Sequence, residues 1–271
     1  MSRSSYIGIT VSTILLGLAL AMWLPLTAED LVLNWGTWRL SLHLSGTLLI
    51  GVVLVALAST GMDAVIRPLF GARGRIGDRV PLWVLPALVS VAGLLALDDL
   101  WWGYQLAIIG ATGIVLAGAM LAGYHAANTA SSHRSLARLT LQLLAYVVAM
   151  RLFTSLYGSR IRGILLGSGA LALGGGLALV LFGGDEVRSR RVWLYAGIVG
   201  LAMGQLMLAL NYYLLDERLA GALLLLVFYT LAGLAQQHLW ERLTLRVALE
   251  YGATLLIGVG AIALLNRWIA L

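Results

Sequence analysis

The sequence predicts an all-α fold: a polytopic bundle of about nine transmembrane helices that forms a single integral-membrane domain over residues 1–271. Of the 271 residues, 61% are hydrophobic and only 11% are charged, whereas soluble domains carry about 25% charged residues. The mean hydropathy is +0.93. Apolar runs of about 17 to 21 residues recur along the chain, and each is long enough to cross a hydrocarbon core of about 30 Å.

Nine apolar runs define the expected helices. The first run follows Arg3 and precedes Trp23, Pro25 and acidic residues instead of a small-residue cleavage site, so we expect it to remain as a helix. No polar connection is long enough for a soluble domain. The expected helices span residues 6–24, 41–59, 82–97, 102–121, 139–156, 162–182, 192–210, 219–238 and 247–265.

The composition excludes several kinds of chemistry. All 18 basic residues are arginine, and cysteine is absent. Lysine Schiff bases, thiol catalysis, iron–sulfur clusters, disulfides and cysteine-ligated zinc are therefore excluded. The four histidines are not spaced as metal or haem ligands. We predict no metal site and no catalytic residue, and the sequence identifies no cofactor.

The arginines predict the orientation of the chain, because the cytoplasmic loops of membrane proteins collect positive charge. With the amino terminus inside, the outer segments hold only Arg39, Arg160, Arg162, Arg218 and Arg267. An odd number of spans then places the carboxyl terminus outside. We expect the membrane to be the inner membrane of a bacterial cell. The inner segments hold Arg3, Arg67, Arg73, Arg75, Arg79, Arg134, Arg138, Arg188, Arg190, Arg191, Arg242 and Arg246.

The net charge is +6. We expect this positive charge to contact the phosphates of lipid headgroups, because the arginines lie in short loops beside apolar spans. We therefore expect membrane lipids as partners and no nucleic acid. In the second inner loop, Met62, Val65, Ile66, Leu69 and Phe70 form one helical face, which favours a short interfacial helix. Its flanking arginines either bind anionic headgroups or simply anchor the loop. These candidate headgroup-binding residues are Arg67, Arg73, Arg75 and Arg79.

Glycines indicate where helices pack closely, because small residues let backbones approach in a membrane. The sixth span has Gly163 and Gly167 in a GxxxG spacing, followed by consecutive glycines at 174–176. With the glycine-rich fourth, seventh and ninth spans, it is expected to form the tightly packed centre. The triple glycine favours close packing over an unwound segment that lines a cavity.

Four charged residues at or near membrane depth are candidate polar or ion-pair sites. Arg151 lies inside the fifth span and Glu250 near the start of the ninth, while Asp98 and Asp99 form an acidic outer turn. A charge at this depth needs a partner, bound water or a path to the interface. We expect Arg151 to pair with the acidic turn instead of Glu250. Binding of an anion and plain snorkelling are the alternatives.

One stretch supports an enzymatic alternative. Residues 63–79, with Arg67-Pro68-Leu69 and Gly74-Arg75-Ile76, faintly resemble UbiA-type intramembrane prenyltransferases. That family binds an isoprenoid diphosphate through magnesium, using aspartates clustered after its second and sixth helices. The resemblance implies a role for Asp63, Asp78, Asp185 and Glu186 in this chain, but their spacing departs from the family motif. Lipid-diphosphate or prenyl-transfer chemistry is therefore the second alternative, and an enzyme is less expected than a non-enzyme.

The leading hypothesis is a non-catalytic subunit, scaffold or assembly partner of a larger membrane complex, in contact with other membrane protein subunits. The small-residue helix faces and the aromatic outer turns favour it. A carrier for a small or lipidic solute is the alternative. Convergence of Gln105, Gln142, Arg151, Gln205 and Glu250 around a cavity would favour the carrier, and their dispersal on packed faces would favour the scaffold.

The orientation generates a direct test, because the chain has no native cysteine to interfere. Single substitutions Arg73→Cys and Arg190→Cys should escape an impermeant maleimide in intact cells, whereas Asp98→Cys and Leu271→Cys should be labelled. Labelling of the variant at position 73 before lysis would reverse the predicted topology.

Overall fold

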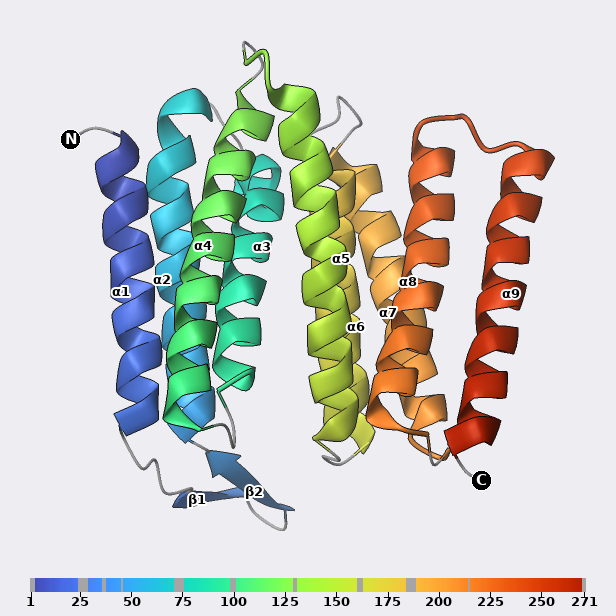
Figure 1. The fold of residues 1–271 in the computed structure, drawn as a ribbon, viewed down its shortest axis with the longest axis horizontal. Helices are drawn as coiled ribbons and strands as arrows, with labels where there is room; N and C mark the ends of the chain where they lie inside the picture. The colour runs from blue at the N-terminus through green and yellow to red at the C-terminus, as the bar shows by residue number, and fades with distance from the viewer. Residues whose placement is uncertain are drawn as a thin grey trace.

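The computed structural model describes residues 3–23, 29–35, 38–44, 46–70, 76–97, 101–128, 131–159, 163–183, 189–213 and 215–269. Within these ranges, nine helices are long and apolar enough to cross a membrane, and they stand side by side with alternating direction (Figure 1). This finding suggests a multi-pass membrane protein. The helices are α1 (Arg3–Trp23), α2 (Gly46–Phe70), α3 (Ile76–Leu95), α4 (Trp102–Ala127), α5 (Arg134–Gly158), α6 (Gly163–Phe182), α7 (Ser189–Leu210), α8 (Glu217–Leu239) and α9 (Leu245–Ile269).

The helices α1 to α8 form two four-helix units with the same connectivity. In the first unit, α1 contacts α2 and α4, and α3 contacts the same two helices. In the second unit, α5 contacts α6 and α8, and α7 contacts the same two helices. The units meet where α3 and α4 contact α5 and where α3 contacts α6. We call this contact the seam.

The helix α9 lies outside both units. It packs chiefly on α8, at the far edge of the bundle (Figure 1), and none of its apolar window is buried. A tyrosine holds it in place: a Cβ atom at Gly233 of α8 would collide with the ring of Tyr251. The expectation that the ninth span lies at the packed centre is therefore wrong, since Gly252 and Gly260 face open space.

Arginines gather at one end of the bundle, which we call the basic end. It is the end at which α1 begins, and α9 ends at the opposite one (Figure 1). The two ends of the described chain thus lie apart, as an odd number of spans requires. The arginines at the basic end, among the described residues, are Arg3, Arg67, Arg79, Arg134, Arg138, Arg190, Arg191, Arg242 and Arg246.

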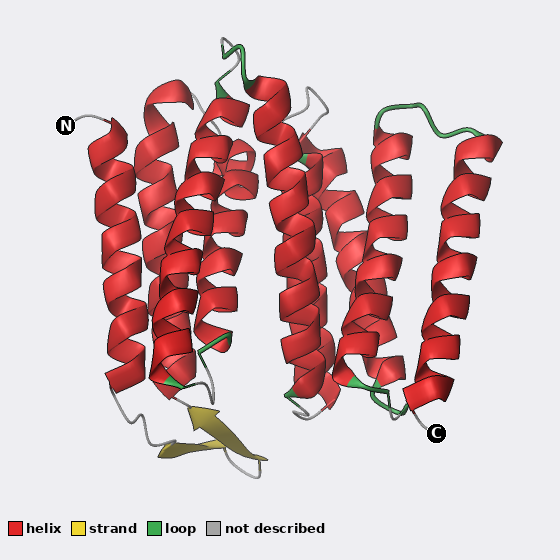
Figure 2. Ribbon diagram, in the orientation of Figure 1, coloured by secondary structure: helices red, strands yellow, loops and turns green. Residues whose placement is uncertain are grey.

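A β-hairpin at the opposite end was not expected from the sequence. The strands β1 (Glu29–Trp35) and β2 (Trp38–Leu44) pair antiparallel, with Trp35 opposite Trp38 (Figure 2). Alternating apolar and polar residues across 29–44 have the period of two that favours strands. The second span therefore begins at Gly46, and residues 41–44, assigned to a helix from their hydropathy, belong to β2.

The expected interfacial helix is also absent from the described residues, because α2 runs without a break from Gly46 to Phe70. Its apolar face is buried inside the bundle, with Met62 and Ile66 0% exposed and Val65 3% exposed. Other helices of the protein, and not lipid headgroups, therefore cover this apolar face.

The closest helix contact joins α6 and α7, two of the four spans that the glycines predicted to pack closely. The triple glycine lies within the continuous helix α6, which supports close packing over an unwound segment. A Cβ atom at Gly200 would lie 2.6 Å from the carbonyl oxygen of Leu171, and one at Gly204 would lie 2.8 Å from that of Gly167. Backbone therefore meets backbone along this pair, which leaves no room for a side chain.

This contact predicts opposite outcomes for two neighbouring glycines of α7. Gly200→Ala should lower the melting temperature in detergent, because overpacking costs about 1 to 3 kcal/mol. Gly197→Ala is the matched control: nothing lies within 4 Å of its added Cβ, and alanine is the better helix former. Thermal unfolding followed by circular dichroism compares the two variants, and equal melting temperatures would contradict the contact.

Candidate functional site

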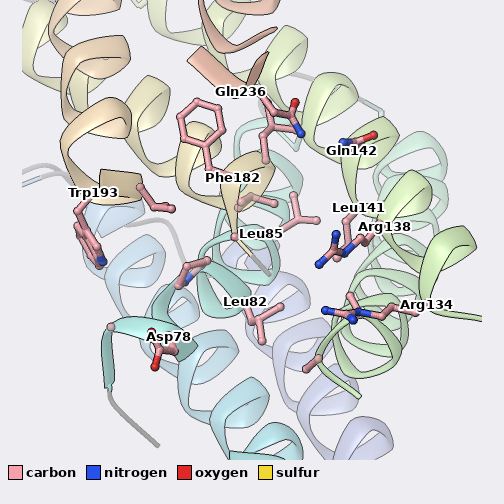
Figure 3. Close-up of a pocket in the computed structure, with 18 of the residues that line it drawn as sticks. Asp78, Leu82, Leu85, Arg134, Arg138, Leu141, Gln142, Phe182, Trp193 and Gln236 are labelled. Atoms are coloured by element: carbon pink, nitrogen blue, oxygen red, sulfur yellow. The ribbon is translucent and has the colours of Figure 1, made fainter. Parts of the chain in front are cut away.

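A pocket of about 360 Å³ opens at the basic end of the bundle, across the seam (Figure 3). Residues of α2 to α8 line it. It reaches inward at least as far as Leu85 of α3. Leu85 lies about 13 Å along the helix axis from Ile76, the first residue of α3. The pocket therefore has one end among the arginines and the other among apolar side chains.

One wall of the pocket carries positive charge. Arg134, Arg138 and Gln142 follow one another at intervals of four residues along α5, so they share one face of that helix. All three side chains are half-buried, and Figure 3 shows them together on one side of the pocket. Two guanidinium groups one helical turn apart are suited to a phosphate or carboxylate, which arginine binds through several hydrogen bonds.

The facing wall, from α3, supplies hydrogen-bond acceptors. The exposed carboxylate of Asp78 lies across the pocket from the two arginines (Figure 3). Pro81 and Pro86 lie inside α3, and proline has no N–H to donate to the carbonyl four residues earlier. The carbonyl groups of Gly77 and Leu82 therefore lack their ordinary helical donor, and both residues line the pocket.

The inner part of the pocket is apolar, and it is built from side chains of both units. Leu85, Leu181 and Phe182 are buried there, at 1%, 5% and 2% exposure. The helix α6 approaches α3 closely at this point, since a Cβ atom at Gly183 would lie 2.6 Å from the Cβ atom of Pro81. The pocket thus combines a charged mouth with a hydrocarbon floor.

The third side of the pocket adds aromatic and amide groups. Trp193 of α7 and Trp240, which follows α8, line the pocket and are partly exposed, while the half-buried amide of Gln236 lies nearby on α8. Pockets of this size, apolar with a few polar groups, are typical of small-ligand sites. The arrangement suits an amphiphile whose anionic group lies at the arginines and whose apolar part lies on the floor.

Comparison with known proteins places the chain in a family. Residues 29–265 match the model of a family described as "Protein of unknown function (DUF5656)". The chain belongs to this family. No curated protein and no solved structure matches the chain. The matched range contains every residue that lines the pocket.

The polar residues expected to mark a carrier site do not converge as a group. Gln142 lines the pocket, whereas Gln205 is exposed on α7 and Glu250 pairs with Arg246 on the surface of α9, at 3.5 Å. Gln105 donates a hydrogen bond to the carbonyl oxygen of Leu97 at 3.0 Å.

Arg151 bridges the two units at the end of the seam away from the pocket. Its guanidinium donates a hydrogen bond to the carbonyl oxygen of Leu95 at 2.9 Å. Leu95 is the last residue of α3, where the helix dipole favours a cation. Asp98 and Asp99 lie outside the described residues, so their pairing with Arg151 remains a prediction.

The four candidate headgroup-binding arginines have different surroundings. Arg67 is exposed near the end of α2, and Arg73 and Arg75 lie outside the described residues. Arg79 is turned into the bundle: its Nη1 atom lies 3.6 Å from the Oδ1 atom of Asp63, and its guanidinium lies over the ring of Phe70 at 5.8 Å. It therefore joins α3 to α2.

Two of the four acidic residues implied by the prenyltransferase resemblance are described, and their surroundings differ. Asp63 pairs with Arg79, Asp78 is exposed at the pocket, and Asp185 and Glu186 lie outside the described residues. Among the residues that the structure describes, no group of three or more histidines and acids is placed to hold a metal ion.

Sequence reasoning counted Arg134 and Arg138 only as signals of orientation. Their spacing with Gln142 is a visible clue, because three polar residues at intervals of four on an otherwise apolar span share one face. The facing wall had no comparable signal. Nothing in the spacing of Asp78, Pro81 and Pro86 indicates that α3 lies opposite α5.

The bond from Arg151 to Leu95 predicts a measurable contribution to stability. Arg151→Gln should lower the melting temperature, since hydrogen bonds between membrane helices contribute about 0.6 to 1.7 kcal/mol. Arg246→Gln, which removes an arginine from an exposed pair at 90% and 67% exposure, should have little effect. Equal melting temperatures for Arg151→Gln and the native protein would show that the bond across the seam contributes nothing.

Proposed function

We propose that this protein is a carrier that takes up an amphiphile with an anionic group from the cytoplasmic leaflet of a bacterial inner membrane. The observation that carries the proposal is the pocket, in which Arg134 and Arg138 lie above a hydrocarbon floor. We place the basic end at the cytoplasm, following the arginine distribution. The mouth of the pocket then lies at the level of the lipid headgroups.

The two four-helix units support the carrier over the scaffold. Many membrane transporters consist of repeated units, and their substrate sites lie between the repeats. Here the two units have the same helix contacts, and the pocket lies across their seam. The floor receives side chains from both units, so a movement of one unit against the other changes the pocket.

A second proposal, a non-catalytic subunit of a larger complex, is supported by the dispersal of Gln105, Arg151, Gln205 and Glu250 away from the pocket and by two further observations. Gln205 presents an amide on the exposed face of α7, and α9 offers a helix that is almost unburied. A polar side chain on a lipid-facing surface is often a helix-contact residue. We favour the carrier, because a subunit role gives no reason for the arginine pocket.

The carrier proposal predicts that anionic lipid binding depends on the pocket arginines. With lauroyl lysophosphatidylglycerol as the probe, Arg134→Gln/Arg138→Gln should weaken binding by more than about tenfold. Hydrogen bonds to charged groups contribute about 1.5 to 3 kcal/mol each, and 1.4 kcal/mol is a factor of ten. Tryptophan fluorescence in detergent measures binding, because Trp193 and Trp240 line the pocket.

The matched control removes two positive charges at the same end of the bundle. Arg190 and Arg191 of α7 are exposed and lie outside the pocket, so Arg190→Gln/Arg191→Gln should bind the probe as the native protein does. If both double variants lose the same affinity, the probe binds to a diffuse basic surface, and the carrier proposal fails.

A further inference from the structure

The pocket has two walls of opposite character, a feature that an anion alone does not use. Arg134 and Arg138 lie on the α5 side, and Asp78 lies across from them (Figure 3). A ligand that carries only negative charge gains from the arginines but is repelled by the carboxylate. A ligand that carries both signs gains from both walls.

We infer that the pocket recognises a zwitterion, a phosphate ester linked to an ammonium group, as in the headgroup of an ethanolamine phospholipid. The inference rests on the proposed function and names the ligand class of the same site. The phosphate binds to the guanidinium groups of Arg134 and Arg138. The ammonium binds toward Asp78.

Two further features of the pocket suit an ammonium group. The carbonyl groups of Gly77 and Leu82 lack their ordinary helical donors because of Pro81 and Pro86, and an ammonium is a donor with no acceptor capacity. Trp193 lines the third side of the pocket, and a tryptophan ring attracts cations. The pocket therefore offers a carboxylate and an aromatic ring, both of which attract an organic cation.

The apolar floor indicates that the zwitterion belongs to a lipid. A free headgroup is polar throughout and would leave the partly exposed apolar lining of the pocket, which includes Leu82, Val180 and Trp193, in contact with water, whereas an acyl chain covers it. Burial of apolar surface adds to the affinity in proportion to the area removed from water. We therefore expect a chain attached to the headgroup to tighten binding.

The test compares three probes on the full-length protein in detergent. Lauroyl lysophosphatidylethanolamine carries both charges and a chain, lauroyl lysophosphatidylglycerol lacks the ammonium, and glycerophosphoethanolamine lacks the chain. Asp78→Asn should weaken binding of the ethanolamine lysolipid by about twofold to fivefold, as expected for an exposed ion pair, and leave binding of the glycerol lysolipid unchanged or tighter. The control is Glu250→Gln, which changes an acidic residue of α9 outside the pocket. This substitution should change neither affinity.

The outcomes separate this inference from the proposed function. If Arg134→Gln/Arg138→Gln weakens both lysolipids but Asp78→Asn changes neither, the anion pocket stands and the zwitterion inference is wrong. If the arginine variant changes nothing, the carrier proposal itself fails. Binding of glycerophosphoethanolamine as tightly as the lysolipid, with the same dependence on Asp78, would support the zwitterion and assign it to a water-soluble source.

Discussion

The seam between the two four-helix units is the contact on which the rest of the structure depends. At the basic end the units separate enough to leave the pocket, and at the other end Arg151 of α5 joins the last carbonyl of α3. The helix α3 is central to both features, because it touches both α5 and α6. Pro81 lines the pocket and Pro86 follows Leu85 at its inner end, so one segment supplies packing, backbone acceptors and a carboxylate.

Charge at the basic end has more than one use. Arg190 and Arg191 are exposed, whereas Arg134 and Arg138 are half-buried in the pocket and Arg79 is turned toward Asp63. The rule that cytoplasmic loops collect positive charge considers only which residues lie in which loop. It therefore does not distinguish one of these arginines from another. Their different surroundings follow from helix packing, which places some guanidinium groups toward solvent and others between helices.

The sequence predicted the features that depend on one segment at a time. Hydropathy located all nine helices, and glycine content marked α6 and α7 as closely packing helices, because each signal is local to a helix. The predictions that were wrong concerned neighbours. The face of Met62 and Ile66 was assigned to headgroups although other helices bury it, and α9 was assigned to the centre although it lies at the edge. The pocket was missed for the same reason, since opposing walls are defined only by which helices meet.

The even number of helices in each unit determines how the chain is divided between the two ends of the bundle. Both units begin at the basic end and return to it, so the connection between α4 and α5 stays on one side. Each half of the chain is therefore a closed hairpin pair with its own arginines to orient it. Each unit thus crosses the membrane an even number of times by itself, and the two units meet by lateral packing along the seam.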